Sequence, residues 1–332
     1  MKKNKKILFL SSFIIILILI PLFIYSYNIL NKVNTEDFTN DTDELGISNS
    51  KMNSNGENNK PSNNEITNIA LFGIDNRSTN DKGRSDAILV VSINTIDNEL
   101  KLISIMRDSY VNIDGYGYDK LNHAYAYGGP LLAVKTINQT FELDIKDYVT
   151  VNFESVIDII DYFGGITIDI NEDEMELINK YQYEASAITG KPVQTLNSFG
   201  KINLTGMQAL SYSRIRDLGN GDFERTSRQR KVCELLAEKI KNMEVTQIPS
   251  TISKIAPMFS TSLTKKEMIN IGYSALNTVS NLDQERFPVD GYCDRKIVDD
   301  IWYLSFDETE TANQIHKYIY EDIKPLEKDP LF

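Results

Sequence analysis

The sequence predicts an α/β domain whose central mixed β-sheet is flanked by helices on both faces and is preceded by one transmembrane helix. Short β-rich apolar runs alternate with segments of helical periodicity from residue 66 onward, which favours a single α/β domain. An uncharged apolar stretch over residues 7–27 lies ahead of it. The 41% apolar and 10% aromatic content is ordinary for a globular protein, and the sequence has no internal repeat.

The N-terminal stretch is typical of a membrane anchor. Residues 1–6, MKKNKK, form a cationic tip, and residues 7–27 carry no charged side chain. At about 1.5 Å per residue, a helix of this stretch is about 30 Å long and matches the hydrocarbon core of a bilayer. The lysines are expected to stay in the cytoplasm, which predicts a single-pass cell-membrane protein with an extracellular domain. A cleaved signal peptide is the alternative, but residues 20–32 offer no small-residue cleavage site.

Residues 28–65 predict a disordered extracytoplasmic tether. They are rich in Asn, Ser, Asp and Glu, and their few apolar residues show no period. Such a segment buries too little surface to offset the entropy of ordering its chain. The domain itself is expected to span residues 66–332, with its motifs within residues 66–245.

Strands are expected in five runs of this domain. NIALFGID delivers Asp75 to its C-terminal end, and the link TIDN between DAILVVSIN and ELKLISIMRD is a hairpin signal. The remaining two runs are YVTVNF and ITIDI.

Helices are expected in six segments. GPLLAVKTINQTFEL has Pro130 in its first turn, ESVIDIIDYFGG is stopped by glycine, and TGMQALSYSRIR has Thr205 as its candidate N-cap. The other three are DFERTSRQRKVCELLAEKIKNM, which begins near Asp222, KEMINIGYSALNTV and ETANQIHKYIYEDI.

An arginine cluster is the most informative local feature. Residues 210–230 hold five of the chain's ten arginines, although the net charge is −12. Arg225 and Gln229 share a helical face, Arg214 and Arg216 precede them, and the glycines of LGNGD let the chain turn back between the two groups. We therefore expect a pocket lined by fixed cations. Because clustered guanidinium groups repel one another and suit phosphate oxygens, a diphosphate is the expected ligand.

Separate surface ion pairs are the alternative reading of this cluster. That reading accounts for Arg228, Arg230 and Lys231, but few acidic residues lie within one turn of the other arginines. Asp222 is expected to cap the helix that it starts and to orient an arginine.

Two carboxylates predict a magnesium site near the start of the domain. Asp75 ends one strand and Asp86 begins the next, so the two can meet at one edge of the sheet. Mg²⁺ typically takes one or two carboxylates together with phosphate oxygens and water. Arg84 and Arg107 would add cations at strand ends. Turn chemistry is the alternative reading for both aspartates.

Other functional classes find little support. The net charge argues against nucleic-acid binding, and no phosphate-binding loop of the G-x-x-x-x-G-K-[ST] type is present. His316 is expected to be a surface or packing residue, and for His123 a buried hydrogen-bonded role is favoured over that of a base. Cys233 and Cys293 allow one disulfide or two free thiols, and their spacing does not decide between these.

Six stretches occur in the order expected for the LytR-CpsA-Psr family. They are LFGIDNR, GRSDAILV, SIMRD, KLNHAYAYGG, LTGMQALSYSRIR and GDFERTSRQR. The resemblance covers residues 66–245, and the short cytoplasmic tip, the single anchor and the external domain also match the family. Residues 246–332 carry no motif that we can tie to chemistry.

The resemblance implies a membrane-anchored phosphotransferase of Gram-positive bacteria. It would move an anionic glycopolymer, such as teichoic acid or capsule, from undecaprenyl diphosphate to the 6-hydroxyl of N-acetylmuramic acid in peptidoglycan. Asp75 and Asp86 would hold Mg²⁺, and Asp75 or Asp222 would accept the proton. The diphosphate would be bound by Arg84, Arg107, Arg214, Arg216, Arg225 and Gln229. The catalytic set would be Asp75, Arg107, Arg214, Arg216 and Asp222.

Two details and two rival functions complete the sequence-based expectations. Met106 stands where the family usually has proline, which would leave the backbone before Arg107 less rigid. The runs YVTVNF and ITIDI are candidate walls of a groove for the lipid tail.

Two rival functions remain open. A diphosphatase would use the same pocket with water as acceptor, and a non-catalytic regulator or wall-binding module would catalyse no reaction.

Overall fold

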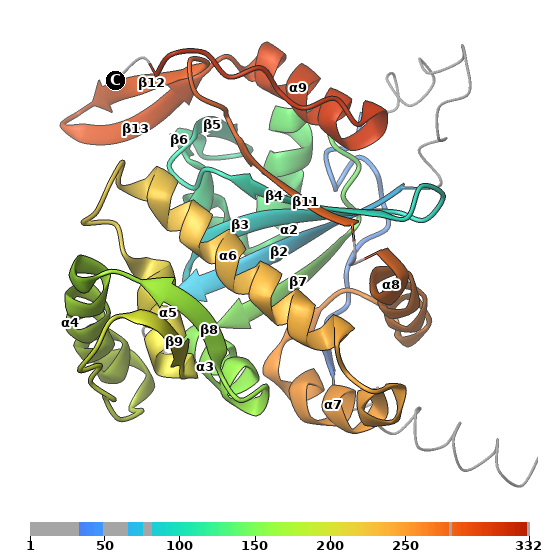
Figure 1. Cartoon of the computed structure of the whole chain (residues 1–332). Coiled ribbons are helices and arrows are strands. Elements are labelled where there is room, and N and C mark those ends of the chain that lie inside the picture. Colours follow the sequence, from blue (N-terminus) through green and yellow to red (C-terminus); the bar gives the residue numbers. More distant parts are fainter. Residues whose placement is uncertain (1–32, 49–65, 76–81, 279–280, 331–332) are drawn as a thin grey trace, which may run out of the picture.

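A central mixed sheet organises the structure, which is a computed structural model describing residues 33–48, 66–75, 82–278 and 281–330 (Figure 1). Its seven strands run in the order β1-β10-β7-β2-β3-β4-β11. The pairs β1–β10, β7–β2 and β4–β11 are parallel, and the other three are antiparallel. The strands are β1 (Asn34–Thr35), β2 (Ile66–Asp75), β3 (Arg84–Asn94), β4 (Glu99–Ile105), β7 (Asp147–Asn152), β10 (Ser260–Thr261) and β11 (Leu282–Phe287).

The hairpin predicted at TIDN joins β3 to β4, as expected. Asn94 pairs with Glu99 at its end. The side chain of Asn94 accepts hydrogen bonds from the amides of Ile96 and Asp97 at 3.0 and 3.1 Å, and Asn98 takes a left-handed conformation. The turn chemistry of the sequence therefore sets the register of these strands.

Helices cover both faces of the sheet, which confirms this part of the predicted fold class. The helices α2 (Leu121–Phe141) and α9 (Glu308–Glu321) share one buried apolar cluster with strand residues such as Phe72 and Val90. On the other face, α8 (Lys265–Thr278) packs near Ile69 and Ile93. The long helix α6 (Asp222–Lys241) crosses that same face in Figure 1.

Helix α2 starts eight residues earlier than the sequence indicated. A break at Gly129, with φ of 72°, separates two helical segments, and Pro130 opens the second one. Pro130 is thus correctly placed in a first turn, because its ring is compatible with a helix start. The first segment, from Leu121, was hidden by the glycine pair that follows it.

A helical subdomain packs beyond the end of the sheet. It contains α3 (Phe153–Tyr162), α4 (Glu172–Thr189), α5 (Gly206–Arg214) and the small sheet of β8 (Ile166–Ile170) and β9 (Gly200–Leu204). The run ITIDI is a strand as predicted, but it pairs only with β9 and lies outside the central sheet. The predicted N-cap Thr205 precedes α5, and its amide donates to Gln208 Oε1 at 2.9 Å.

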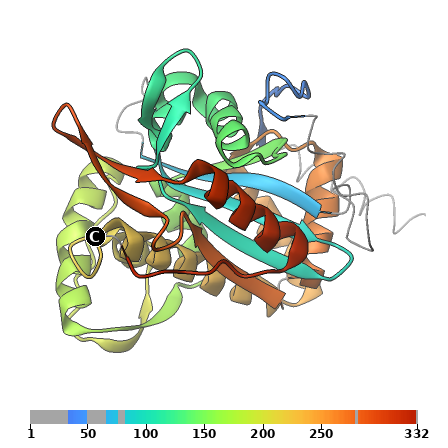
Figure 2. The same cartoon turned by 90° about the horizontal axis from the view of Figure 1, so that it is seen from above.

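Two further hairpins project side by side above the sheet edge (Figure 2). The first is β5 (Tyr110–Ile113) with β6 (Gly117–Lys120), and the second is β12 (Cys293–Val298) with β13 (Ile301–Phe306). A bridge between Ser109 and Leu304 ties them together, and the amide of Leu304 donates to Asp108 O at 2.9 Å. The remaining helices are η1 (Val245–Gln247), α7 (Ile248–Ile255) and η2 (Ala256–Met258).

The prediction of a disordered tether is wrong for residues 33–48. Leu45 and Ile47 belong to the main buried cluster, and Phe38 packs edge-on against Tyr148 with ring centroids 5.0 Å apart. The Tyr148 hydroxyl also donates to Glu36 at 2.6 Å. These few apolar side chains suffice because the folded domain offers them a preformed surface. We call residues 33–48 the N-terminal strap.

The predicted cytoplasmic tip, the anchor over residues 7–27 and the rest of the predicted tether lie outside the described residues. Within the ranges that the structure describes, no helix has the length and apolarity needed to cross a bilayer.

Shortening Leu45 tests whether the N-terminal strap is part of the fold. Leu45 is fully buried, so Leu45→Ala should lower the free energy of unfolding by about 3 kcal/mol through lost burial and a residual cavity. Urea denaturation measures this change, and Glu44→Ala, at an exposed neighbour, should change it by less than about 0.5 kcal/mol. Equal stability of the two variants would show that the strap does not contribute to the core.

Candidate functional site

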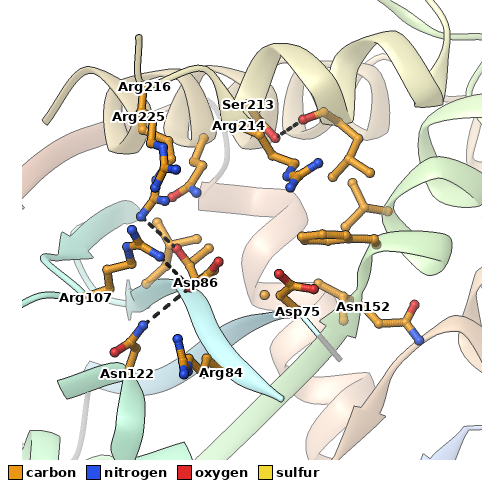
Figure 3. A pocket seen from close by; sticks show the side chains of 18 of the residues that line it. Asp75, Arg84, Asp86, Arg107, Asn122, Asn152, Ser213, Arg214, Arg216 and Arg225 are labelled. Carbon is orange, nitrogen blue, oxygen red and sulfur yellow. Dashed lines mark hydrogen bonds and ion pairs between the residues drawn. The ribbon is translucent and has the colours of Figure 1, made fainter. Parts of the chain in front are cut away.

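A cavity of about 680 Å³ opens where β2 and β7 end and β3 begins, beneath α5 and α6 (Figure 3). Eight of the nine residues predicted for the site line it, and the ninth, Asp222, contacts two of them. Figure 3 shows Arg214, Arg216 and Arg225 on the side of the helices and the aspartates on the side of the strands. The eight are Asp75, Arg84, Asp86, Arg107, Arg214, Arg216, Arg225 and Gln229.

A β-bulge brings the two strand-end carboxylates to the same cavity. Gly73 pairs with Ala87, but Ile74 pairs with Ser85, so Asp86 is an extra residue on β3. Regular alternation would place Asp86 on the face of Ile88, which is buried in the core. The extra residue re-aims its side chain, and Asp86 lines the cavity together with Asp75.

Arg107 is held by three carboxylates. Its Nη1 donates to Asp86 Oδ1 at 2.7 Å, and its Nε lies 2.9 Å from Asp222 Oδ2 and 3.3 Å from Asp108 Oδ2. Asn122 also donates to Asp86 Oδ1, at 3.4 Å. The guanidinium group is therefore fixed at the cavity wall before any ligand binds.

Asp222 holds the two central arginines together. Its Oδ2 accepts from Arg225 Nη2 at 2.8 Å as well as from Arg107. The prediction that Asp222 is an N-cap is wrong, because Gly221 occupies that position with φ of 59° and Asp222 is the first helical residue. The expectation that it orients an arginine is confirmed.

The charges around these groups shift their pKa values. Burial by itself raises the pKa of Asp86 and Asp222, but the neighbouring Arg107 and Arg225 outweigh burial and hold both pKa values below the usual range. Burial raises the pKa of Asp108, despite its contact with Arg107. Asp86 and Asp222 are therefore ionised at neutral pH.

Two guanidinium groups keep donors for a ligand. Nη1 of Arg214 and Nε of Arg225 are buried and have no hydrogen-bond partner among the described residues. The Arg214 guanidinium stacks on the ring of Phe153 at 4.9 Å and lies 3.4 Å from Glu184. Buried donors without partners are costly, so an anion bound in the cavity would offset this cost. Arg84 and Arg216 are exposed and form the rim of the cavity.

Sequence reasoning missed several polar residues of the cavity. Asp108 and Asn122 contact the arginine network directly, and Lys120 donates to Asp108 at 2.6 Å. Asp108 directly follows Arg107, and the stretch KLNHAYAYGG contains the other two, so proximity to a quoted motif was the available signal. His123 also lines the cavity, half-buried, with Nδ1 2.7 Å from Asp119. The expected hydrogen bond is confirmed, but the expectation that His123 is buried is wrong, because it is half-buried at the cavity wall.

The other part of the cavity is apolar. Val151 and Phe153 come from the run YVTVNF, which was a candidate wall for a lipid groove. The second candidate, ITIDI, is wrong, because its residues do not line the cavity and its isoleucines pack in the helical subdomain. Further apolar side chains come from the sheet and from α3, α5 and α6: Leu71, Leu89, Val156, Leu210 and Val232.

The cavity offers oxygen ligands of the kind that Mg²⁺ prefers. Arg107 and Asn122 both donate to Oδ1 of Asp86, so its Oδ2 and the carboxylate of Asp75 are the candidate ligands. No group of three or more metal-ligating side chains occurs in the described part of the chain. A metal held here would thus take its other ligands from the substrate and from water.

Comparison with known proteins identifies the family. The LytR_cpsA_psr family profile matches residues 25–319. The chain belongs to the LytR-CpsA-Psr family. A relative from Bacillus mycoides (strain KBAB4), named polyisoprenyl-teichoic acid–peptidoglycan teichoic acid transferase TagU, is 33% identical over 309 residues. The match covers 90% of this chain and 92% of the relative.

Solved structures of the LytR-CpsA-Psr family share the fold. TagT bound to LI-WTA is 27% identical, with a TM-score of 0.60, and the match covers 79% of this chain and 92% of that chain. YwtF of Bacillus subtilis (TagT) with bound octaprenyl pyrophosphate lipid is also 27% identical, with a TM-score of 0.57 and coverage of 77% and 90%.

Met106, the departure from the usual LytR-CpsA-Psr pattern, is accommodated without loss of order. Its side chain is fully buried, and its amide donates to Phe287 O at 3.0 Å, which links β4 to β11. Proline has no amide hydrogen and could not make this bond. Arg107, the residue that follows Met106, is also held in place by its three carboxylate partners.

Cys233 and Cys293 are both free, which settles the open question of a disulfide.

Replacing Asp222 tests the arginine network. Asp222→Asn leaves the buried Arg225 without its carboxylate partner, so it should lower the free energy of unfolding by about 3 kcal/mol at pH 7. Because the pKa of Asp222 is lowered in the folded state, its ionised form stabilises the protein above the unfolded-state pKa of about 4. That contribution is lost as the pH falls through the lowered value, so the difference between wild type and variant should shrink there.

Denaturant unfolding between pH 7 and pH 3 measures both effects. Asp217→Asn is the matched control, because it removes an exposed carboxylate that pairs with Lys180 at 2.9 Å, and it should cost less than about 1 kcal/mol. A pH-independent difference for Asp222→Asn would contradict the proposed electrostatic role.

Proposed function

We propose that this protein is a transferase that moves teichoic acid from a polyprenyl diphosphate lipid to peptidoglycan. The observation that carries the proposal is a cavity in which clustered arginines adjoin an apolar section. The buried donors of Arg214 and Arg225 suit the diphosphate, and the apolar section suits the lipid chain next to it. The relative named TagU and the lipid-bound structure of YwtF support this substrate class.

The arginines supply most of the proposed catalysis. When a hydroxyl of the acceptor attacks the phosphorus on the glycan side, the bond to the lipid phosphate breaks and negative charge grows on the leaving oxygen. Guanidinium groups already fixed in place stabilise this charge without having to reorganise. Arg107 and Arg225 meet that condition through Asp222, and Arg214 meets it by stacking on Phe153.

Asp75 is the better candidate for the base that accepts the hydroxyl proton. Asp222 is committed to two guanidinium groups, and its lowered pKa makes it a weak proton acceptor. Asp75 lines the cavity beside the bulge of Asp86, and if one of its carboxylate oxygens held Mg²⁺, the other would accept the proton. Asp222 then acts as a positioning residue.

Mg²⁺ belongs to this proposal. Asp75 and Asp86 would hold this ion, and the ion would neutralise charge on the diphosphate oxygens.

The membrane anchor over residues 7–27 is also part of the proposal, because the lipid carrier is embedded in a membrane and the domain must work at the outer surface of that membrane. The 6-hydroxyl of N-acetylmuramic acid is the proposed acceptor.

A reconstituted reaction tests the function. The full chain in detergent should join a polyprenyl diphosphate-linked teichoic acid to peptidoglycan strands, and Arg225→Ala should lower the rate by about 10² to 10³. Lys231→Ala is the matched control, because Lys231 is an exposed cation of the same helix that pairs with Glu234, and it should keep the wild-type rate. Release of phosphate products without conjugate would favour the diphosphatase, and neither product would favour a regulatory or wall-binding role.

Metal removal tests the place of Mg²⁺. Transfer by the wild-type chain should be lost in EDTA and recovered when Mg²⁺ is added in excess, because without the metal the carboxylates of Asp75 and Asp86 would repel the anionic diphosphate. Asp75→Asn should lower transfer by about 10² or more and keep a cooperative thermal transition. Full transfer in EDTA would show that catalysis does not need Mg²⁺, and the arginine cluster alone would then account for binding of the diphosphate.

A further inference from the structure

An exposed aromatic surface lies on the two projecting hairpins and the start of α2. Tyr116 and Tyr118 are 58% and 57% exposed, and Tyr127 is 38% exposed. Large exposed aromatic patches usually mark interaction sites. We call this surface the aromatic shelf, and it comprises Tyr110, Tyr116, Tyr118, Tyr127 and Trp302, with the buried Tyr303 packed against Tyr110.

The rings of the aromatic shelf are held in fixed orientations. Tyr116 stacks on Tyr127 with centroids 4.4 Å apart and an interplanar angle of 13°. Tyr110 stacks on Tyr118 at 5.1 Å and meets Tyr303 edge-on at 4.8 Å, which joins the two hairpins. Rings that are already held in place lose little side-chain entropy when they bind a ligand.

The aromatic shelf is continuous with the polar end of the cavity. Lys120 lines the cavity, and its Nζ lies 5.6 Å from the Trp302 ring and 5.7 Å from the Tyr303 ring. Asp119 Oδ2 accepts a hydrogen bond from Tyr127 at 2.6 Å and lies 2.7 Å from Nδ1 of the cavity residue His123. A chain of sugars on the shelf would thus reach the arginine network without crossing a gap.

We propose that the aromatic shelf binds the sugar rings of the acceptor, the glycan strand of peptidoglycan. This inference rests on the proposed function and adds a place for its second substrate. Pyranose rings present apolar C–H faces that pack on tyrosine and tryptophan rings, while their hydroxyl groups bond to neighbouring polar atoms. Tyrosine hydroxyls, Lys120 and Asp119 provide such atoms at the edge of the shelf.

Charge favours the acceptor over the donor polymer as the occupant. Residues 110–120 and 293–306, which form the two hairpins, carry five acidic and three basic side chains. This net negative charge weakens the binding of a polymer with a phosphate in every repeat, even with Lys296 Nζ 4.0 Å from the Tyr110 ring. The glycan backbone of peptidoglycan carries no charge on its sugar rings, so stacking meets no electrostatic opposition.

Paired substitutions on the shelf test the inference. In the full chain in detergent, the double variant Tyr116→Ala with Tyr118→Ala should raise the KM for peptidoglycan strands about tenfold and leave the KM for the lipid diphosphate unchanged. The double variant Tyr116→Phe with Tyr118→Phe should raise the acceptor KM much less than the alanine pair, because it keeps the stacking rings and loses only the hydroxyl contacts. Tyr183→Ala is the control, since Tyr183 is 65% exposed on α4 and lies off the shelf.

A second readout keeps this test separate from that of the proposed function. Co-sedimentation with peptidoglycan sacculi stripped of teichoic acid measures acceptor binding without turnover, and the alanine pair should lose about nine-tenths of the wild-type binding. If the wild type binds sacculi through the shelf but forms no conjugate, the proposed function fails and the shelf stands. Unchanged binding and acceptor KM in the alanine pair, or a rise in the donor KM alone, would overturn the inference.

Discussion

The shared carboxylate oxygen of Asp222 is the interaction on which the site depends. Two guanidinium groups 118 positions apart in the chain meet on one atom, Arg107 from the end of β4 and Arg225 from α6. Two buried cations this close would repel each other without that anion. The pairing therefore joins the sheet to the helix that covers it, and it leaves the remaining guanidinium donors directed at the cavity.

The sheet makes its own contribution through one irregularity. The additional residue in β3 turns Asp86 away from the core and toward Arg107. Asp86 then carries charge on the cavity side, whereas Ile88, two positions later, remains in the core. A single extra residue thus adds a carboxylate to the cavity side of a strand whose Arg84 and Leu89 also line the cavity.

Much of the site could be predicted from the sequence because its residues are of types that seldom cluster without a ligand. Arg214, Arg216 and Arg225 lie close together in the chain, so their meeting needed only one turn between two helices. The bulge at Asp86 could not be predicted, because it depends on how β2 and β3 pair and not on either strand alone. The contact of Asn122 with Asp86 was missed because it also joins two segments whose relative position the sequence does not give.

The errors in the fold have related physical causes. ITIDI has the composition of a strand, but composition does not state which partner a strand pairs with, and β8 pairs outside the central sheet. The composition of the segment around Leu45 predicted disorder, because it is mostly polar. The segment is nevertheless packed on the domain through contacts with residues distant in sequence, such as the side-chain amide of Asn138, which donates to Leu45 O at 2.9 Å. Local patterns carry no information about such contacts.

If residues 7–27 form the proposed anchor, the docked N-terminal strap limits how far the domain can stand from the membrane. With the anchor proposed over residues 7–27, only residues 28–32 separate it from Val33, the first residue of the strap. Five residues reach at most about 18 Å even when fully extended. A free tether ending at residue 65 would have let the domain range over several times that height. With the proposed anchor, this short reach would keep the strap, and the domain that packs on it, next to the membrane that holds the lipid carrier.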